Sequence, residues 1–149
     1  MLLRFRQDVI ELKPAVVHIL AGINDVAQNA GPMDLEVIEG NLASMMELAR
    51  ANGIAVVLGS VLPASEIPWR RGLEPGPKIL ALNDWLAAYA RSRDIVFVDY
   101  YSAMTDGALG MRAALATDGV HPTPAGYRVM LPLAEAGIAA ALRQGTQRR

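Results

Sequence analysis

The chain has 149 residues, of which 52% are hydrophobic and 19% charged, a composition typical of a single compact globular domain. Its net charge is −1 and no basic stripe is present, which argues against nucleic acid or an anionic membrane as a partner. The absence of cysteine excludes disulfides and thiolate metal sites, and no apolar run approaches the roughly 20 residues of a membrane span.

The first part of the chain alternates helix and strand. Apolar residues recur at helical spacing over residues 2–12, which predicts an amphipathic helix. Residues 15–20 form a continuous apolar run, typical of a parallel strand that is covered on both faces. A loop rich in turn residues over 22–32 leads to a predicted helix over 34–51, and residues 54–59 form the second apolar strand.

The middle of the chain begins with its longest irregular stretch, residues 61–77, which contains four prolines. A helix is predicted over 78–92 and a short apolar strand over 95–98. Residues 100–116 are ambiguous, and a helical turn followed by a loop that leads to Asp118 is expected there.

A closing helix is predicted from Pro124 to about Leu142, with Thr123 as its N-cap. Pro132 is expected to kink it, and the polar tail over residues 145–149 is expected to fray. The alternation of helices and strands predicts an α/β fold with a parallel sheet, right-handed crossovers and helices on both faces. One domain is expected to span residues 1–149.

One motif places a carboxylate next to a histidine. Asp118 precedes His121, one of only two histidines, by three residues, and Gly119 allows the tight turn that brings the carboxylate to an imidazole nitrogen. Such a bond fixes the tautomer and leaves the other nitrogen free to take a proton from a nucleophile. The second histidine, His18, lies within the first predicted strand and is interpreted as a core or cross-strand residue.

A second motif, Gly22-Ile23-Asn24-Asp25, directly follows the first strand. An asparagine amide at the end of a strand can donate to a developing oxyanion. Asp118 and Asn24 taken singly are equally explained as turn formers. Their occurrence together, in this order and on an α/β background, favours a catalytic interpretation.

These two motifs, Gly22-x-Asn24-Asp25 and Asp118-x-x-His121, resemble the third and fifth sequence blocks of the SGNH (GDSL) hydrolase superfamily. The resemblance extends from about Leu2 to Leu142. It implies a flavodoxin-like three-layer α/β/α sandwich, in which the three strands found here would be the third to fifth of five. It also implies a serine ester hydrolase without cofactor or metal, in which His121 is the general base, Asp118 its orienting acid and Asn24 an oxyanion donor.

The first two blocks of that superfamily, including the Gly-Asp-Ser stretch with the nucleophile, have no match in this sequence. The chain is therefore expected to be truncated at its N-terminus and inactive alone. Ser60 is the only serine whose position suits a nucleophile, because it follows the second strand at the correct edge of the sheet. Nothing like a nucleophile elbow surrounds it. The alternative is a non-catalytic binding or assembly module that keeps the crevice.

The substrate expected from the resemblance is a small ester with a short acyl or acetyl group. Gly22, Asp25 and Trp69 are expected to line the crevice, because loops at the carboxyl ends of strands overhang the ligand in such folds. For Trp69, packing of its own loop is the other open interpretation. Without the first two strands, residues 15–20 would form an unprotected sheet edge, so a homodimer through this strand is expected.

Overall fold

A computed structural model describes residues 1–147 of the chain, with side chains described through Gly145. Its centre is a parallel sheet of three strands in the order β1 (Val16–Ile19), β2 (Ala55–Gly59) and β3 (Val96–Val98). All three strands were predicted from their apolar runs, with ends that differ by at most one residue. The parallel direction confirms the expected α/β class.

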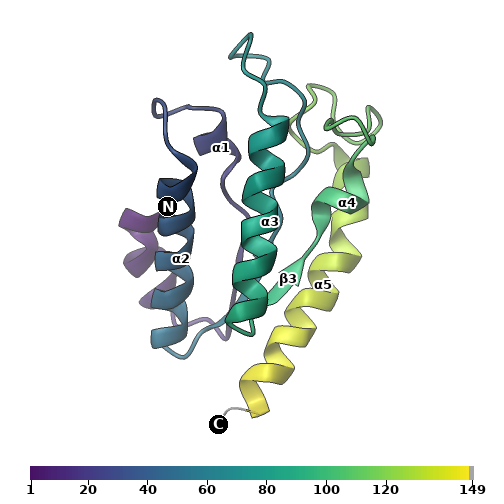
Figure 1. Ribbon diagram of the computed structural model, residues 1–149. Helices are drawn as coiled ribbons and strands as arrows, with labels where there is room; N and C mark the ends of the chain where they lie inside the picture. The colour runs from purple at the N-terminus through teal and green to yellow at the C-terminus, as the bar shows by residue number, and fades with distance from the viewer. Residues whose placement is uncertain (148–149) are drawn as a thin grey trace.

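Helices cover both faces of the sheet. On one face lie α2 (Leu35–Ala51) and α3 (Gly76–Ser92), side by side in Figure 1, and on the other lies α5 (Pro124–Gln147). Successive side chains of a strand point to opposite faces, and β2 shows the consequence. Val56 and Leu58 join the hydrophobic cluster beneath α2 and α3, whereas Val57 joins the cluster beneath α5. The arrangement is a three-layer α/β/α sandwich.

The N-terminal segment is helical but less regular than predicted. It consists of a 3-10 turn, η1 (Leu2–Arg4), and a stretch of π-helix, η2 (Arg6–Ile10). Between them Phe5 is 3% exposed and is the anchor of the segment in the core. Leu2, Val9 and Ile10 pack against the same core as Phe5, so the apolar spacing over residues 2–12 predicted the buried side of the segment but not its irregular backbone.

Two short helices lie outside the longer helices that the sequence predicts. The predicted loop 22–32 contains α1 (Ile23–Val26), whose last residue is buried in the core. The stretch after β3 forms α4 (Tyr100–Met104), in agreement with the helical turn expected there, and the Asp99 side chain caps it by accepting from the backbone N–H of Ser102 at 2.9 Å. Both helices are too short for apolar periodicity to reveal them.

The closing helix α5 begins as predicted. The Thr123 hydroxyl accepts from the backbone N–H of Gly126 at 3.3 Å, as an N-cap residue does. The helix continues past Pro132 as one element and extends to Gln147, so the expected end near Leu142 is wrong. Its last turns pack on the sheet, since Ala141 is 1% exposed and a Cβ on Gly145 would lie 4.0 Å from Ala55. Arg148 and Arg149 lie outside the described residues.

Candidate active site

The loops that carry the motif residues gather at one end of the molecule. Figure 1 shows α1, the loop before α3 and the loop after α4 together at the top of the view, beyond the carboxyl ends of the strands. An apolar pocket of about 170 Å³ opens there, lined by Leu20, Ala21, Ile23, Val61, Leu62, Val120, His121 and Pro122. His121 and Ile23, the residue before Asn24, thus line the same pocket.

The Asp118–His121 pair forms through a tight turn. The Oδ2 atom of Asp118 lies 2.6 Å from Nδ1 of His121, and Oδ1 accepts from the backbone N–H groups of Val120 and His121 at 2.9 and 2.8 Å. Gly119, with φ of +79°, supplies the left-handed backbone that the turn requires.

The electrostatics of the turn favour the ionised carboxylate. The imidazole of His121, followed by the two backbone N–H donors, holds the pKa of the Asp118 carboxyl well below its usual range. An ionised Asp118 on Nδ1 makes Nε2 the nitrogen that can exchange a proton. The His121 side chain is 70% exposed, so this nitrogen is accessible to a reactant.

Asn24 is connected to His121 through two further side chains. Its Oδ1 accepts from Nδ2 of Asn29 at 2.9 Å, and Oδ1 of Asn29 accepts from the indole N–H of Trp69 at 2.8 Å. The Trp69 ring stacks on the imidazole of His121, with centroids 5.6 Å apart and planes 28° from parallel. Trp69 therefore packs its loop onto the α1 loop and also contacts His121, while its contact with a substrate stays a prediction.

The remaining motif residues, Gly22 and Asp25, shape the start of α1. Gly22 has φ of +121°, and its carbonyl accepts from the N–H groups of Asp25 and Val26. A Cβ at Gly22 would lie 3.0 Å from Leu82, so a side chain there has no room. Asp25 is half-buried in the first turn. Contact of either residue with a substrate stays a prediction.

Ser60 and His18 have structural partners. The Ser60 side chain is 1% exposed, and its hydroxyl accepts from the backbone N–H of Tyr101 at 2.8 Å, which ties the end of β2 to α4. His18 is half-buried, lies 3.3 Å from the Tyr100 hydroxyl and meets that ring edge-on. Burial lowers the pKa of His18, which disfavours the charged imidazolium. These contacts agree with the core or cross-strand role expected for His18, and they leave the Ser60 hydroxyl occupied by a backbone donor.

Two residues important to the site carried no functional signal in the sequence. Asn29 was only one of several turn residues in its loop. Asn83 was one member of a helix face, yet its buried carboxamide accepts from the N–H of Val61 at 2.7 Å and donates to the carbonyl of Val61 at 3.0 Å. This pair of hydrogen bonds holds the segment that brings Val61 and Leu62 to the pocket.

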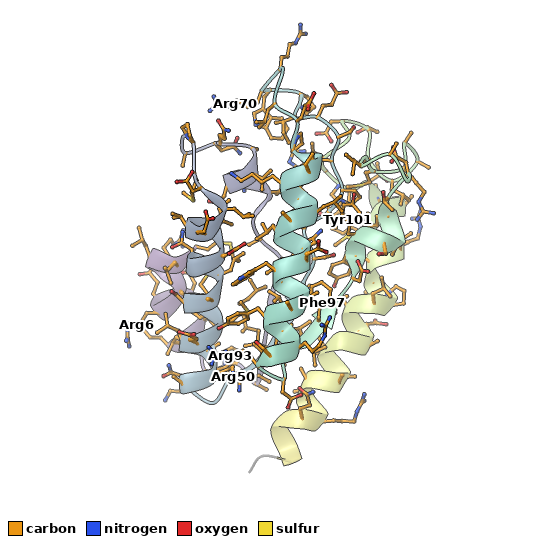
Figure 2. All side chains as sticks on the ribbon, in the orientation of Figure 1. Arg6, Arg50, Arg70, Arg93, Phe97 and Tyr101 are labelled. Atoms are coloured by element: carbon orange, nitrogen blue, oxygen red, sulfur yellow. The ribbon has the colours of Figure 1, made fainter. Side chains whose placement is uncertain are left out.

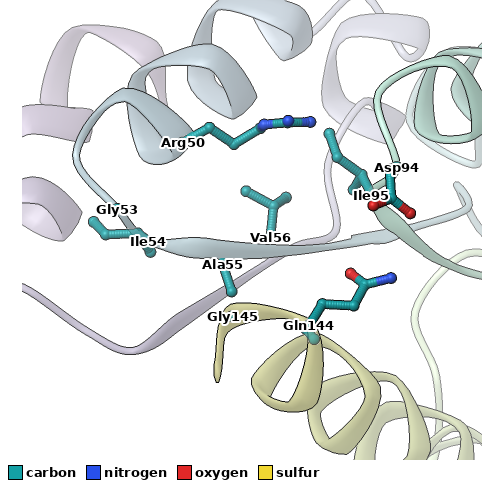
Figure 3. Close-up of a pocket in the computed structure, with 10 residues that line it drawn as sticks. Arg50, Gly53, Ile54, Ala55, Val56, Asp94, Ile95, Gln144 and Gly145 are labelled. Carbon is teal, nitrogen blue, oxygen red and sulfur yellow. The ribbon is translucent and has the colours of Figure 1, made fainter. Parts of the chain in front are cut away.

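A second cavity, of about 310 Å³, lies at the other end of the sheet. Its lining includes Arg50, Val56 and Asp94 together with Gln144 of α5 (Figure 3), and none of the motif residues. Ligands of open α/β sheets bind beyond the carboxyl ends of the strands, so we assign the site to the smaller pocket at His121.

Two features are absent from the part of the chain that the structure describes, residues 1–147. No group of three or more histidine, aspartate or glutamate side chains is arranged to hold a metal ion. No helix in this range has both the length and the apolar character needed to cross a bilayer.

Known proteins resemble this chain in sequence and in structure. It is 34% identical over 114 residues to esterase TesA of Pseudomonas aeruginosa, which covers 75% of this chain and 49% of that protein. The chain thus spans about half the length of this curated relative. A GDSL-like lipase from Bacteroides thetaiotaomicron is 48% identical, with a TM-score of 0.86 over 96% of this chain and 69% of that one.

Two further structures show the same fold. A candidate acylhydrolase from Bacteroides fragilis is 45% identical, with a TM-score of 0.91 over 95% of this chain and 69% of that one. The acetylxylan esterase Axe2 from Geobacillus stearothermophilus is 25% identical, with a TM-score of 0.73 over 91% of this chain and 64% of that one. The family model described as GDSL-like Lipase/Acylhydrolase matches residues 1–129, and the chain therefore belongs to the GDSL-like lipase/acylhydrolase family.

Proposed function

We propose that the chain carries the general base and one oxyanion donor of a serine ester hydrolase. The observation that carries the proposal is the 2.6 Å bond between Asp118 and His121 beside the apolar pocket. Nε2 of His121 accepts the proton of a serine hydroxyl as its oxygen attacks the acyl carbon, and the amide of Asn24 donates to the oxyanion. His121 then returns the proton to the departing alcohol, and water repeats the cycle on the acyl-enzyme.

The proposed substrates are esters of short acyl groups, including acetyl esters. A pocket of about 170 Å³ with a mainly apolar lining suits a short chain. The names of the relatives agree, since TesA is an esterase and Axe2 an acetylxylan esterase. Gly22, Asp25 and Trp69 are proposed to contact the substrate because the first two flank Asn24 in the chain and Trp69 stacks on His121.

We further propose that the chain has no turnover by itself. Gly-Asp-Ser does not occur in the sequence, and the Ser60 hydroxyl is buried against the N–H of Tyr101. We expect no hydrolysis of p-nitrophenyl acetate or butyrate above background, and no labelling by a fluorophosphonate probe in mass spectrometry. Stoichiometric labelling of Ser60 would contradict this and identify an unconventional nucleophile.

The positive test supplies the missing block. The N-terminal segment of the Bacteroides thetaiotaomicron relative, fused ahead of this chain, should give hydrolysis of short esters. His121→Ala should then lower kcat about 100- to 10,000-fold, the range for general acid–base catalysis, whereas Ser102→Ala should leave it unchanged. A folded fusion that binds an ester analogue without hydrolysing it would favour the non-catalytic binding module instead.

We also propose that a second copy of the chain covers β1. In the described residues β1 pairs with β2 alone, and its sequence Val-Val-His-Ile has no charge or proline to block further pairing. The carbonyl of Ala15 accepts from the backbone N–H of Ala55, so it points toward β2. Because the backbone groups of successive residues in a strand point to opposite sides, the N–H of Val16 points to the open edge.

Sedimentation at micromolar concentration should therefore give twice the chain mass of 16.0 kDa. Val16→Pro removes an N–H from the open edge alone and should yield monomers, while Val16→Ala should stay dimeric. A wild-type monomer, or a dimer that is indifferent to Val16→Pro, would contradict an interface through β1.

A further inference from the structure

The indole of Trp69 determines how two asparagine side chains are oriented. An indole N–H can only donate, so the atom of Asn29 that faces it at 2.8 Å must be the carbonyl oxygen. The amino group of Asn29 then faces Asn24, and the Asn24 atom that meets it at 2.9 Å must likewise be the oxygen. The hydrogen-bond network, rather than either asparagine alone, thus determines which atom of each carboxamide is the oxygen and which is the nitrogen.

This order of donors and acceptors has a chemical consequence at Asn24. Its oxygen is held by Asn29, so its amino group is the edge turned away from Asn29. An oxyanion needs a donor there, and a flipped carboxamide would present an oxygen that repels it. We propose that Trp69 and Asn29 are positioning residues that lock the donor edge of Asn24 toward the reacting atoms. The inference rests on the proposed oxyanion role of Asn24.

The same indole also contacts the general base. Trp69 stacks on His121 while its N–H is held by Asn29, so one side chain bridges the two halves of the proposed site. Arg70 (Figure 2) fastens this contact, because its guanidinium donates to the carbonyl of Gln28 at 2.9 Å. Any movement of the loop over residues 61–77 therefore acts on the base and on the oxyanion donor together.

The sharpest test is Asn29→Asp compared with Asn29→Ala. A carboxylate has acceptors only, so one oxygen of the aspartate keeps the bond to Trp69 while the other attracts the amino group of Asn24. Aspartate, although the closer isostere of asparagine, should turn the Asn24 carboxamide over so that its amino group faces position 29. Alanine only removes the hydrogen bond and leaves the carboxamide free to rotate. Trp69→Phe keeps a ring on His121 but removes the N–H, so it should release both asparagines.

The readout is the hydrogen-exchange rate of the Asn24 side-chain amino protons in the 149-residue chain, measured by NMR. The rate is compared with that of the exposed side-chain amide of Asn52, which serves as the reference. In Asn29→Asp these protons should exchange at least about tenfold more slowly than in wild type, as expected for a bond to a charged acceptor. Acidification that protonates the aspartate should abolish the protection, because a carboxylic acid can again donate. In Asn29→Ala and Trp69→Phe no such protection should appear.

Exchange that is equal in Asn29→Asp and Asn29→Ala, with both variants folded by circular dichroism, would overturn the inference. In the fusion that carries Gly-Asp-Ser, Asn29→Asp should also lower kcat at least about tenfold more than Asn29→Ala, the loss expected when a donor is replaced by an acceptor. If the Asn24 protons are protected in Asn29→Asp but kcat does not differ in this way, the positioning roles of Trp69 and Asn29 are retained. That result would refute the oxyanion role of Asn24, so the two failures are distinguishable.

Discussion

Asn83→Ala should lower the free energy of unfolding by about 2–5 kcal/mol, since each buried polar group left without a partner costs roughly 1–3 kcal/mol. The substitution leaves two such groups, the N–H and the carbonyl of Val61, which the Asn83 carboxamide satisfies at 2.7 and 3.0 Å. Alanine recovers part of the loss because it has a higher helix propensity than asparagine. Urea unfolding of the variant and the wild type, with the slope m compared, measures the difference.

A matched control is Asn52→Ala. The Asn52 carboxamide donates to the carbonyl of Leu48 at 2.8 Å, but the bond is exposed at the end of α2 and water replaces it. We expect a loss below about 1 kcal/mol there. Equal losses at the two positions would show that the carboxamide of Asn83 does not hold the segment after β2. Asn83→Asp should be no better than alanine, because a carboxylate oxygen would face the carbonyl of Val61.

Gly126→Ala should destabilise the chain by about 1–3 kcal/mol, the usual cost of overpacking. A Cβ at Gly126 would lie 2.7 Å from the carbonyl oxygen of Leu115 and 3.0 Å from Cβ of Pro122. That carbonyl also accepts from the N–H of Thr123 at 2.7 Å, so it cannot retreat without losing the bond at the start of α5. The added methyl group therefore separates α5 from the segment that leads to Asp118 and His121.

The same substitution at Gly40 provides a control of opposite sign. Gly40 lies on the exposed side of α2, and a Cβ there would meet nothing within 4 Å. Gly40→Ala should stabilise the chain by about 0.5–1 kcal/mol through the better helix propensity of alanine. Thermal unfolding of both variants gives the comparison. A stabilising Gly126→Ala would mean that α5 tolerates a larger separation from Leu115 than the structure indicates.

The features that the sequence predicts well are local in the chain. Asp118 and His121 are three residues apart with a glycine between them, so the backbone turn alone brings their side chains together. The strands are recognisable because a buried parallel strand must be apolar on both faces. The N-cap at Thr123 likewise depends only on residues within one turn.

The features that the sequence does not predict depend on contacts between distant residues. The bond between Asn29 and Trp69 joins positions 40 apart in the chain, and that between Asn83 and Val61 joins positions 22 apart. Asparagine is common in loops and tolerated in helices, so nothing in its immediate neighbours marks either residue. The extra turns of α5 are similar, because their own polar sequence does not mark them as helix, and they lie near the distant strand β2, where a Cβ on Gly145 would be 4.0 Å from Ala55.

The order of the sheet has a consequence for biosynthesis. Each strand pairs with the one that follows it in the chain, so the sheet can grow one strand at a time as the ribosome releases it. One layer, made by α2 and α3, is complete before β3 emerges, whereas the cluster on the opposite face is completed by α4, the loop after it and α5, all of which follow β3. A nascent chain that has not yet released these segments therefore exposes Val57 and Val98 to solvent and to chaperones. It already contains Asn24 and Trp69, and it acquires its base only as the final helix begins to appear.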